Sequence, residues 1–434
     1  MALPRMIFAS PDGEILDHPD LVMCGMDGGT PRPVREDELI PLPEGSDVFT
    51  LPARSPLGFD EASGEIVSFD SHSDYVPAGV GAFMAPAHTQ SLRPAYQTEE
   101  GAPVLPTYAY TSMGYRDGQF WVAGLRVDPD PRQDPWRFDR AEIARQVEAF
   151  LARNPDNQVM GQIQRCALEY GCRAAQNFFL SRWEAPLPVS VACNAQCIGC
   201  ISLQPDGEFQ AAHDRLATAP SPTDVAQVAL DHIGRVEEAV VSYGQGCEGE
   251  PLLLTDVLVE STRLIRAATQ RGTVNLNTNG SLPDSVSRLM EVGLDAIRVS
   301  MNSPRPDVYR AYYQPRGYDV DAPIESLRRV RAAGGFTAIN LFVFPGVTDT
   351  EEELQAIETL IEDTGLEMIQ LRNLNIDPEV YARVLPGGTV RKGMGTPQFM
   401  EALKKRFPSL RFGYFNPPRE RFEAWRRESL EELQ

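Results

Sequence analysis

Strand-like and helical runs alternate from residue 187 onward, and this order narrows the folds open to the chain. Apolar runs of strand length lie at 188–192, 239–243, 274–278, 296–301, 338–344 and 368–372. Helical patterns separate them at 222–233, 253–270, 285–292, 324–333 and 351–364. Because strands that alternate with helices form parallel sheets through right-handed crossovers, we expect an α/β fold, a partial (βα)6 TIM-like barrel of about 190 residues.

The chain before this region differs in composition. Residues 1–135 are rich in Pro, Gly, Asp and Ser, with strand-like runs such as 104–110 and 119–125 between turn signals. Helical patterns follow at 139–152 and 162–180. We therefore predict three parts. They are a separate N-terminal α+β domain of unknown role at 1–180, β-rich and then helical, the barrel core at 181–376 and a short C-terminal extension at 377–434.

The chain is strongly acidic. Its 434 residues include 40 Lys and Arg against 61 Asp and Glu, which gives a formal net charge of −21 at pH 7. Such a field repels phosphate backbones and anionic lipid, so nucleic acid and membrane surfaces are disfavoured as partners. The sequence holds no apolar run long enough to span a bilayer and no signal-peptide pattern at its start, so we expect a cytoplasmic protein.

Three of the seven cysteines lie within eight residues, directly after the first expected strand. Cys193, Cys197 and Cys200 form a C-x3-C-x2-C motif. Three thiolates on a tight loop can bind three irons of a [4Fe–4S] cluster and leave the fourth iron open for another ligand. A structural zinc site needs four closing ligands, and the next histidine, His213, is thirteen residues further on. The motif therefore favours an iron–sulfur cluster over zinc, and over cysteines buried as small apolar side chains.

With this spacing after the first strand of a partial (βα)6 barrel, residues 187–376 resemble the radical S-adenosylmethionine (SAM) superfamily. The resemblance implies an oxygen-sensitive enzyme with two cofactors, a [4Fe–4S] cluster bound by Cys193, Cys197 and Cys200, and SAM. One departure is Gly199, since members usually have an aromatic residue before the third cysteine, near the adenine. This departure concerns the adenine contacts and leaves the cluster assignment intact.

The second expected strand ends in a glycine-rich segment, residues 244–250, with the sequence GQGCEGE. It resembles the family's segment that binds the amino end of the methionine, which implies that Gly249 and Glu250 contact SAM. Glycine lets a backbone carbonyl approach a ligand closely, and a carboxylate offsets an ammonium group. The alternative is an ordinary turn in which Pro251 opens the next helix.

Polar side chains also end the third and fourth expected strands, where a parallel sheet presents its pocket. Hydroxyl and amide groups suit ribose and carboxylate ligands. Taken alone, an Asn-Gly pair is also a common turn sequence. The resemblance implies that five of these side chains lie near SAM, with the arginine as a partner for the methionine carboxylate: Asn277, Asn279, Arg298, Ser300 and Asn302.

Four cysteines lie outside the motif: Cys24, Cys166, Cys172 and Cys247. They are candidates for a second iron–sulfur cluster. Against this, the spacing from Cys166 to Cys172 is no standard metal motif, and free cysteine is common in apolar cores. Cys247 lies in the glycine-rich segment and is the one candidate catalytic residue, as a hydrogen-atom donor or as the site of a substrate adduct. Its alternative is a small packing residue.

The resemblance implies reductive cleavage of SAM to a 5′-deoxyadenosyl radical, which abstracts hydrogen from a peptide or small-molecule substrate. An electron donor such as flavodoxin or ferredoxin would reduce the cluster. Two alternatives stay open, a radical SAM methyltransferase and a non-catalytic iron–sulfur or zinc protein. The sequence lacks the P-loop motif of nucleotide kinases and the nucleophile-elbow motif of α/β-hydrolases.

Overall fold

The computed structural model describes residues 2–72, 74–203, 211–388 and 390–431. Among these residues we find no helix whose length and hydropathy would let it span a bilayer. The chain forms two compact units. The first unit comprises Met1–Pro129, Phe342–Gln355 and Leu371–Ala402, and the second unit comprises Asp130–Leu341, Ala356–Gln370 and Leu403–Gln434.

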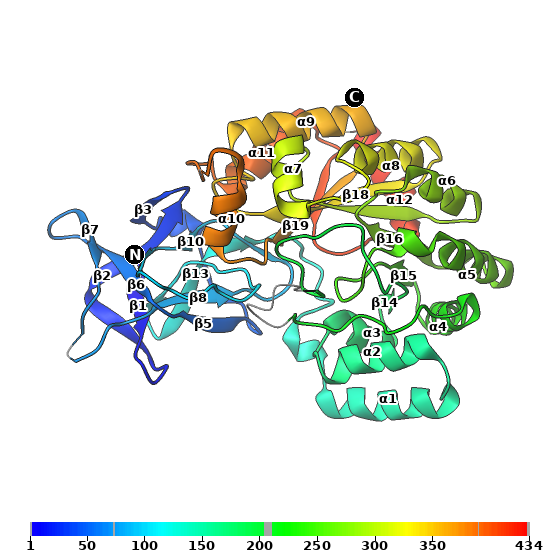
Figure 1. Ribbon diagram of the computed structural model, residues 1–434, viewed down its shortest axis with the longest axis horizontal. Coiled ribbons are helices and arrows are strands. Elements are labelled where there is room, and N and C mark those ends of the chain that lie inside the picture. The colour runs from blue at the N-terminus through cyan, green and yellow to red at the C-terminus, as the bar shows by residue number, and fades with distance from the viewer. Residues whose placement is uncertain (1, 73, 204–210, 389, 432–434) are drawn as a thin grey trace. The chain divides into compact units, whose positions relative to one another are not determined.

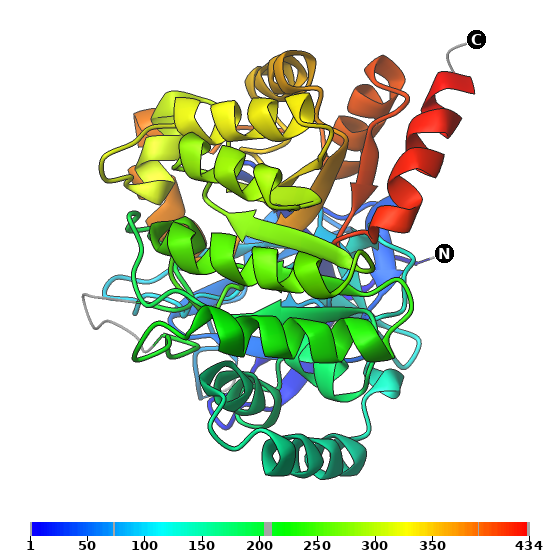
Figure 2. The same ribbon diagram turned by 90° about the vertical axis from the view of Figure 1, so that its right-hand side faces the viewer.

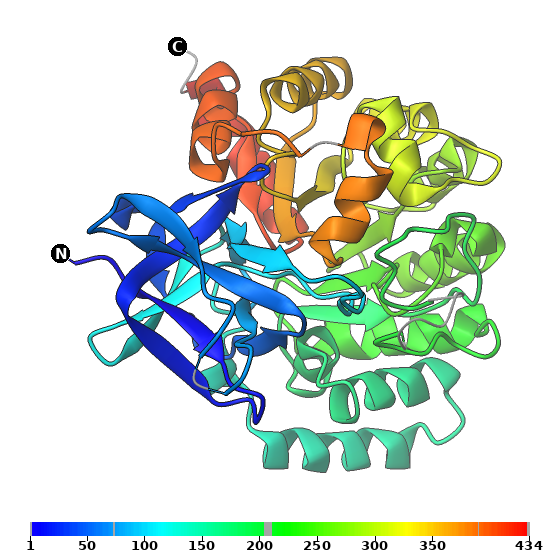
Figure 3. The ribbon, with the colours of Figure 1, turned by 60° about the vertical axis from the view of Figure 1, so that its left-hand side comes forward.

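The first unit is built mainly from antiparallel strands, drawn in blue and cyan in Figure 1 and Figure 3. The strands are β1 (Arg5–Ala9), β2 (Ile15–Asp27), β3 (Thr30–Pro33), β4 (Leu39–Pro41), β5 (Asp47–Leu51), β6 (Arg54–Asp60), β7 (Glu65–Ser68), β8 (Gly79–Phe83), β9 (His88–Gln90), β10 (Arg93–Pro94), β11 (Tyr96–Thr98), β12 (Met113–Arg116) and β13 (Gln119–Arg126). Its helical segments are η1 (Glu36–Glu38), α10 (Pro378–Val384), η4 (Pro386–Gly388) and the start of α11 (Thr396–Arg406).

The larger sheet of this unit follows the order β11-β6-β2-β1-β12-β13-β4, and β5 pairs with β8 separately. A core of buried apolar side chains forms around Ile7, Val80, Met113 and Val122. The run at 119–125 forms β13, as expected, because the Asp-Gly pair before it makes a two-residue turn with positive φ angles of 53° and 79°.

The run at 104–110, also expected to be strand-like, forms no strand. Pro103 and Pro106 have no amide to donate to a sheet, so this stretch cannot pair along its length. Its apolar side chains serve the core instead, since Leu105 and Tyr110 pack with Leu51. The apolar run at 104–110 therefore indicates burial and does not indicate a strand.

Three helices precede the sheet of the second unit. They are α1 (Arg140–Arg153), α2 (Gln158–Leu168) and α3 (Arg173–Phe179), with a short turn of helix, η2 (Pro135–Arg137), before them. Asp139 caps α1, because its carboxylate accepts hydrogen bonds from the amides of Ala141 and Glu142 at 2.8 and 3.0 Å. The sequence predicts one helix over 162–180, but the structure has two, since Gly171 adopts a left-handed φ of 63° between them.

Seven strands form the parallel sheet of the second unit, in sequence order from one edge to the other. They are β14 (Glu184–Leu187), β15 (Val240–Tyr243), β16 (Thr273–Thr278), β17 (Ala296–Met301), β18 (Phe336–Val343), β19 (Met368–Asn373) and β20 (Arg411–Gly413). The expected α/β fold with a parallel sheet is therefore confirmed.

Two strands differ from the expectation. The first strand ends at Leu187 and does not cover 188–192, because the carbonyls of Ser190 and Ala192 accept hydrogen bonds from the amides of Gly249 and Glu250 at 3.1 and 2.8 Å. The seventh strand, β20, was not predicted. It is only three residues long, which is too short to show a pattern, and pairs with β19 in the part expected as a C-terminal extension.

Helices follow most strands and cover one face of this sheet, as Figure 2 shows. The contact is direct at Tyr243, whose hydroxyl lies 2.7 Å from that of Ser261 on the neighbouring helix. The helical segments are α4 (Pro222–Arg235), η3 (Pro251–Leu254), α5 (Thr255–Ala268), α6 (Pro283–Glu291), α7 (Pro306–Tyr313), α8 (Asp321–Ala332), α9 (Glu351–Thr364), η5 (Arg419–Arg421) and α12 (Phe422–Glu431). Asn275 and Asn277 of β16 and Arg298 of β17 lie on the opposite face, which we call the polar face.

Candidate cofactor-binding site

The cysteine loop, residues 193–200, follows β14 and lies against the end of α7. The amide of Gln196 donates to the carbonyl of Tyr313 at 3.0 Å, and that of Ile198 donates to the carbonyl of Tyr312 at 3.1 Å. All three motif cysteines in the loop are partly exposed. These two bonds hold the loop through its backbone and do not engage the cysteine side chains.

Asn279, predicted to bind SAM, also supports the cysteine loop. Its Nδ2 donates to Oδ1 of Asn194 at 2.8 Å, and Nδ2 of Asn194 donates to the hydroxyl of Ser281 at 2.9 Å. The amide of Ser281 donates in turn to Oδ1 of Asn279 at 2.9 Å. This closed ring of hydrogen bonds joins the end of β16 to the residue that follows the first motif cysteine.

The candidate metal ligands in the cysteine loop are the three thiols of Cys193, Cys197 and Cys200. Burial raises the pKa of Cys193 and of Cys197, and Nη2 of Arg215 lies 3.8 Å from the sulfur of Cys200. Within the described part of the chain, no three His, Cys, Asp or Glu side chains are arranged to hold one metal ion. In a [4Fe–4S] cluster each thiolate binds its own iron, and metal binding deprotonates the thiols. Three thiols on one loop therefore fit such a cluster.

The glycine-rich loop, residues 244–250, packs on two backbone segments. Gly244 has a φ of +75°, and a Cβ at this position would lie 1.6 Å from the carbonyl oxygen of Asn277. A Cβ on Gly249 would lie 1.9 Å from the carbonyl oxygen of Ala192. Only glycine permits these contacts. They bring the glycine-rich loop against the end of β16 and against the residue that precedes Cys193.

Glu248 holds the glycine-rich loop from within, although it was not predicted from the sequence. Its carboxylate accepts hydrogen bonds from the backbone amides of Gly244 and Gln245, both at 2.9 Å, and from those of Val189 and Ser190. Four amide donors favour the ionised form, but complete burial outweighs them and raises the pKa to about 7. In the sequence, the only sign of a role for Glu248 is that it lies two positions before Glu250.

Glu250, predicted to contact SAM, is buried and fully engaged with the protein. Its carboxylate accepts hydrogen bonds from the amides of Leu252 and Asn279 at 3.0 and 2.7 Å and from the hydroxyl of Thr278. Burial raises its pKa to about 7. The bond from Leu252 caps η3, as the turn interpretation requires, and the other two fix the end of β16. A contact with the methionine ammonium stays a prediction.

Asn277 lies among other polar side chains on the polar face of the sheet. Its Oδ1 accepts hydrogen bonds from Asn275 at 2.9 Å and from Asn416 at 3.2 Å. Its Nδ2 is buried and has no hydrogen-bond partner within the described residues. A buried amide donor without a partner is costly, so this atom fits a ligand that supplies an acceptor.

Arg298 belongs to the same polar face, where it meets an amide. Its Nη1 donates to Oε1 of Gln370 at 3.1 Å, and Nε2 of Gln370 donates to Oδ1 of Asn416 at 3.0 Å. Nδ2 of Asn416 donates to Glu184 at 2.8 Å. Neither Glu184 nor Asn416 was predicted, because one lies before the expected first strand and the other lies in the expected C-terminal extension.

The last two residues predicted near SAM are at the end of β17. Ser300 is partly exposed and stands in register with Asn340 of β18. Asn302 is buried, and its Nδ2 donates to the carbonyl of Val308 at 3.1 Å, so it fixes the first turn of α7. The structure thus brings Ser300 to the polar face and gives Asn302 a bond to the helix that supports the cysteine loop.

Buried tyrosines of α7 pack beside the cysteine loop. The rings of Tyr309 and Tyr313 stack with centroids 4.5 Å apart, and the hydroxyl of Tyr309 donates to that of Tyr318 at 3.4 Å. Burial raises the pKa of Tyr313, and the neighbouring Cys197 raises it further. These rings were not predicted, since nothing in the sequence links them to the cysteine motif a hundred residues earlier.

The remaining cysteines do not share one environment. Cys24 lies on β2 in the first unit, and burial raises its pKa to about 12, as for a packing residue. Cys166, Cys172 and Cys247 lie in the second unit, where the sulfur atoms of Cys166 and Cys247 are 3.9 Å apart. A second cluster and a catalytic role for Cys247 stay predictions.

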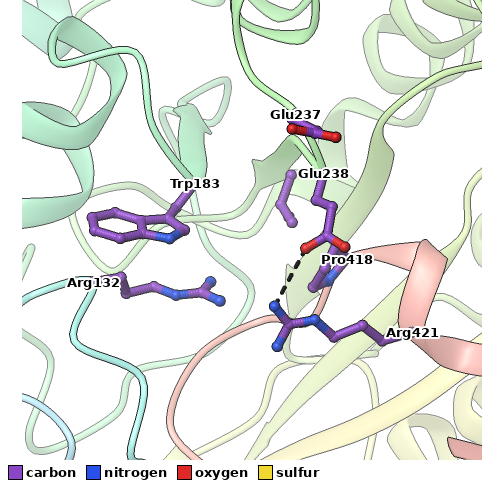
Figure 4. Close-up of a pocket in the computed structure, with 7 residues that line it drawn as sticks. Arg132, Trp183, Glu237, Glu238, Pro418 and Arg421 are labelled. Atoms are coloured by element: carbon purple, nitrogen blue, oxygen red, sulfur yellow. Dashed lines mark hydrogen bonds and ion pairs between the residues drawn. The ribbon is translucent and has the colours of Figure 1, made fainter.

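The structure also has a cavity of about 350 Å³, whose lining residues are drawn in Figure 4. Trp183, which precedes β14, and Pro418, which follows β20, line it together with an ion pair of 3.3 Å between Glu238 and Arg421. Trp183 and Glu238 come before their strands, whereas the cysteine and glycine-rich loops come after them. Because parallel α/β sheets carry their chemistry at the carboxyl ends of the strands, this cavity is not the candidate site.

The part of the chain that contains the cysteine loop and the glycine-rich loop is similar to known proteins. Residues 187–357 match the family model described as the Radical SAM superfamily. The FeMo cofactor biosynthesis protein NifB of Klebsiella pneumoniae is 26% identical over 181 residues, 38% of this chain and 38% of that protein. A GTP 3′,8-cyclase of Streptomyces coelicolor is 30% identical over 162 residues, 37% of this chain and 44% of that protein. The chain thus spans about two-fifths of the length of these relatives.

Solved structures give weaker similarities. A spore photoproduct lyase mutant with bound AdoMet and dinucleoside spore photoproduct has a TM-score of 0.40 and 18% identity, over 53% of this chain and 76% of that chain. Streptococcus suis SuiB bound to S-adenosylmethionine has a TM-score of 0.37 and 15% identity, over 62% of each chain. The assignment rests on the family model, whose match includes both loops and the ends of β16 and β17. The resemblance seen in the sequence is therefore confirmed over residues 187–357, which match the radical SAM superfamily.

Proposed function

We propose that this chain is a radical SAM enzyme with the architecture of a partial (βα)6 barrel. In this proposal Cys193, Cys197 and Cys200 bind a [4Fe–4S] cluster, and the polar face of the sheet receives SAM and the substrate. When bound, the cluster would supply the electron for cleavage of SAM to a 5′-deoxyadenosyl radical, which would abstract hydrogen from the substrate. The residues of this chain position the cofactors and keep water out.

The connection between the two loops is the observation that carries the proposal. The carboxylate of Glu250 accepts a hydrogen bond from the amide of Asn279 at 2.7 Å, and the side chain of Asn279 donates to Asn194 at 2.8 Å. Gly249 and Ala192 meet backbone to backbone. The loop that carries the predicted cluster ligands is therefore hydrogen-bonded to two of the predicted SAM contacts, Glu250 and Asn279. A cofactor bound at the open iron and beside Glu250 needs such a fixed relation between the two loops.

Unpaired polar atoms support a polar ligand on the same face. Asn277 on β16 and Asn340 on β18 are both more than nine-tenths buried, at 3% and 6% exposure. Nδ2 of Asn277 and Oδ1 of Asn340 have no hydrogen-bond partner within the described residues. A buried donor and a buried acceptor left unpaired cost about 1–3 kcal/mol each. We therefore infer a substrate rich in hydrogen-bonding groups, a peptide or a polar small molecule.

Electron paramagnetic resonance of the anaerobically purified, dithionite-reduced chain tests the proposal, with and without SAM. We expect a [4Fe–4S]+ signal whose g-values shift when SAM is added. The variant Cys197→Ala should lose this signal, whereas the control Cys24→Ala should keep it, because Cys24 lies in the first unit. Flavodoxin or ferredoxin, the proposed physiological electron donor, should also reduce the cluster when it is used in place of dithionite.

Three results would contradict the proposal. A cluster signal that ignores SAM would indicate an electron-transfer or structural centre. Bound zinc without iron would indicate a zinc protein. Undiminished SAM cleavage by Cys197→Ala with full cluster content would remove the cysteine loop from the mechanism.

A further inference from the structure

Cys166 and Cys247 come together from segments that are far apart in the sequence. Cys166 is near the end of α2, and Cys247 is in the glycine-rich loop after β15. Their sulfur atoms are 3.9 Å apart, and Nε2 of Gln162 lies 3.8 Å from the sulfur of Cys166. Cys166 is 3% exposed, whereas Cys247 is partly exposed. The pair thus consists of one buried residue and one partly exposed residue.

We propose that Cys166 and Cys247 are a redox-active pair that closes reversibly to a disulfide between α2 and the glycine-rich loop. An S–S bond is about 2.0 Å long, so the sulfur atoms have to approach each other by about 1.9 Å. Rotation about the Cα–Cβ bonds moves sulfur atoms over distances of this order. The inference concerns these two thiols alone and does not depend on cofactor binding.

The oxidant is a low-molecular-weight disulfide of the glutathione type. The thiolate of Cys247, the more exposed residue of the two, attacks one sulfur of the oxidant, forms a mixed disulfide and releases one thiolate. The thiolate of Cys166 then attacks the sulfur of Cys247, forms the internal S–S bond and releases the second thiolate. Two electrons pass to the oxidant, and the two protons lost by Cys166 and Cys247 end on the released thiols. A dithiol reductant reverses both steps.

Cys172 provides the matched control. Its amide donates to the carbonyl of Cys166 at 2.8 Å, so the start of α3 lies beside the end of α2. Cys172 is therefore a nearby thiol that could compete with Cys166 for Cys247. We assign the bond to Cys166 because its sulfur lies 3.9 Å from that of Cys247.

The test is disulfide mapping of the full chain after anaerobic treatment with oxidised glutathione. Free thiols are blocked with iodoacetamide before digestion and mass spectrometry. We expect a cross-linked peptide joining positions 166 and 247 in most molecules, which dithiothreitol removes. Cys166→Ser should instead retain glutathione on Cys247, whereas Cys172→Ser should give the same cross-link as the unchanged chain.

Several outcomes would overturn the inference. They include a cross-link from Cys247 to Cys172, glutathione left on Cys247 in the unchanged chain, and equal alkylation of both thiols after oxidation. A loss of bound iron or zinc in Cys166→Ser, but not in Cys172→Ser, would assign the pair to a metal site. The mapping of the unchanged chain decides the question even where a variant fails to fold. It is also independent of the SAM-dependent signal that tests the proposed function.

Discussion

The cysteine loop and the glycine-rich loop follow neighbouring strands of one sheet, yet they are held in different ways. The cysteine loop is bonded from outside, by backbone carbonyls of α7 and by the side chain of Asn279, and its thiols stay partly exposed. The glycine-rich loop is bonded from within, around the buried carboxylates of Glu248 and Glu250. The difference indicates a division of roles. One loop presents ligands, and the other presents backbone atoms in a fixed shape.

The largest effect is expected where the two loops touch. Gly249→Ala places a Cβ 1.9 Å from the carbonyl oxygen of Ala192, a backbone atom that cannot move without displacing the start of the cysteine loop. Such overpacking should cost about 3 kcal/mol or more of unfolding free energy. The variant should also retain little iron after anaerobic purification. Urea unfolding and iron content per chain measure both effects.

Gly246→Ala is the control within the same loop. Its Cβ would meet the Cδ1 atom of Ile201 at 2.9 Å, the far end of a side chain that can rotate away. We expect a change below about 1 kcal/mol and normal iron content. Equal unfolding free energies for the two alanine variants would show that the contact between Gly249 and Ala192 does not hold the loops together.

A second, smaller effect is a pH dependence of the unfolding free energy that arises from the glycine-rich loop. The folded pKa of Glu248 is about 7, above its usual value of 4.5, because burial favours the neutral form. The stabilisation from this group is therefore complete below pH 4.5 and is lost as the pH rises through 7. The difference between the usual and the folded pKa of Glu248 corresponds to about 3 kcal/mol of unfolding free energy. Glu248→Gln does not titrate, so its stability relative to the unchanged chain should rise by about that amount between about pH 5 and pH 8.

The measurement is urea unfolding of both chains at several pH values. Asn194→Ala, in the cysteine loop, serves as the control and should shift stability equally at every pH, since no titrating group is removed. A difference between Glu248→Gln and the unchanged chain that does not vary with pH would mean that the four amide donors keep the carboxylate ionised throughout.

Short-range patterns made part of the fold and site predictable. β17 and α9 have the expected bounds, because each is a continuous run whose apolar spacing suits one kind of element. The cysteine motif is equally local. Its three residues lie within eight positions, so no knowledge of tertiary contacts was needed to propose a cluster.

Long-range contacts explain what was not predictable. Glu248 lies two residues from Glu250, yet its role depends on the amides of Val189 and Ser190, about sixty residues away. Asn416 meets Glu184 across 232 positions of sequence. Such partners leave no periodicity in the sequence. They follow only from the order of strands in the sheet and from which side chains then face one another.

The smallest effect is expected from loss of the hydrogen bond of 2.8 Å between Asn279 and Asn194. This bond is a side-chain contact that supports the cysteine loop from outside. A double-mutant cycle with Asn194→Ala and Asn279→Ala should give a coupling of about 1 kcal/mol in unfolding free energy. The pair Asn157 and Gln227, bonded at 2.9 Å between α2 and α4, should give a similar coupling and serves as the control. Only the first pair should lower iron retention, because only it positions the cysteine loop. Equal iron retention in both pairs would mean that backbone contacts suffice to hold that loop, and the contrast between the two loops would then rest on the backbone bonds to Tyr312 and Tyr313.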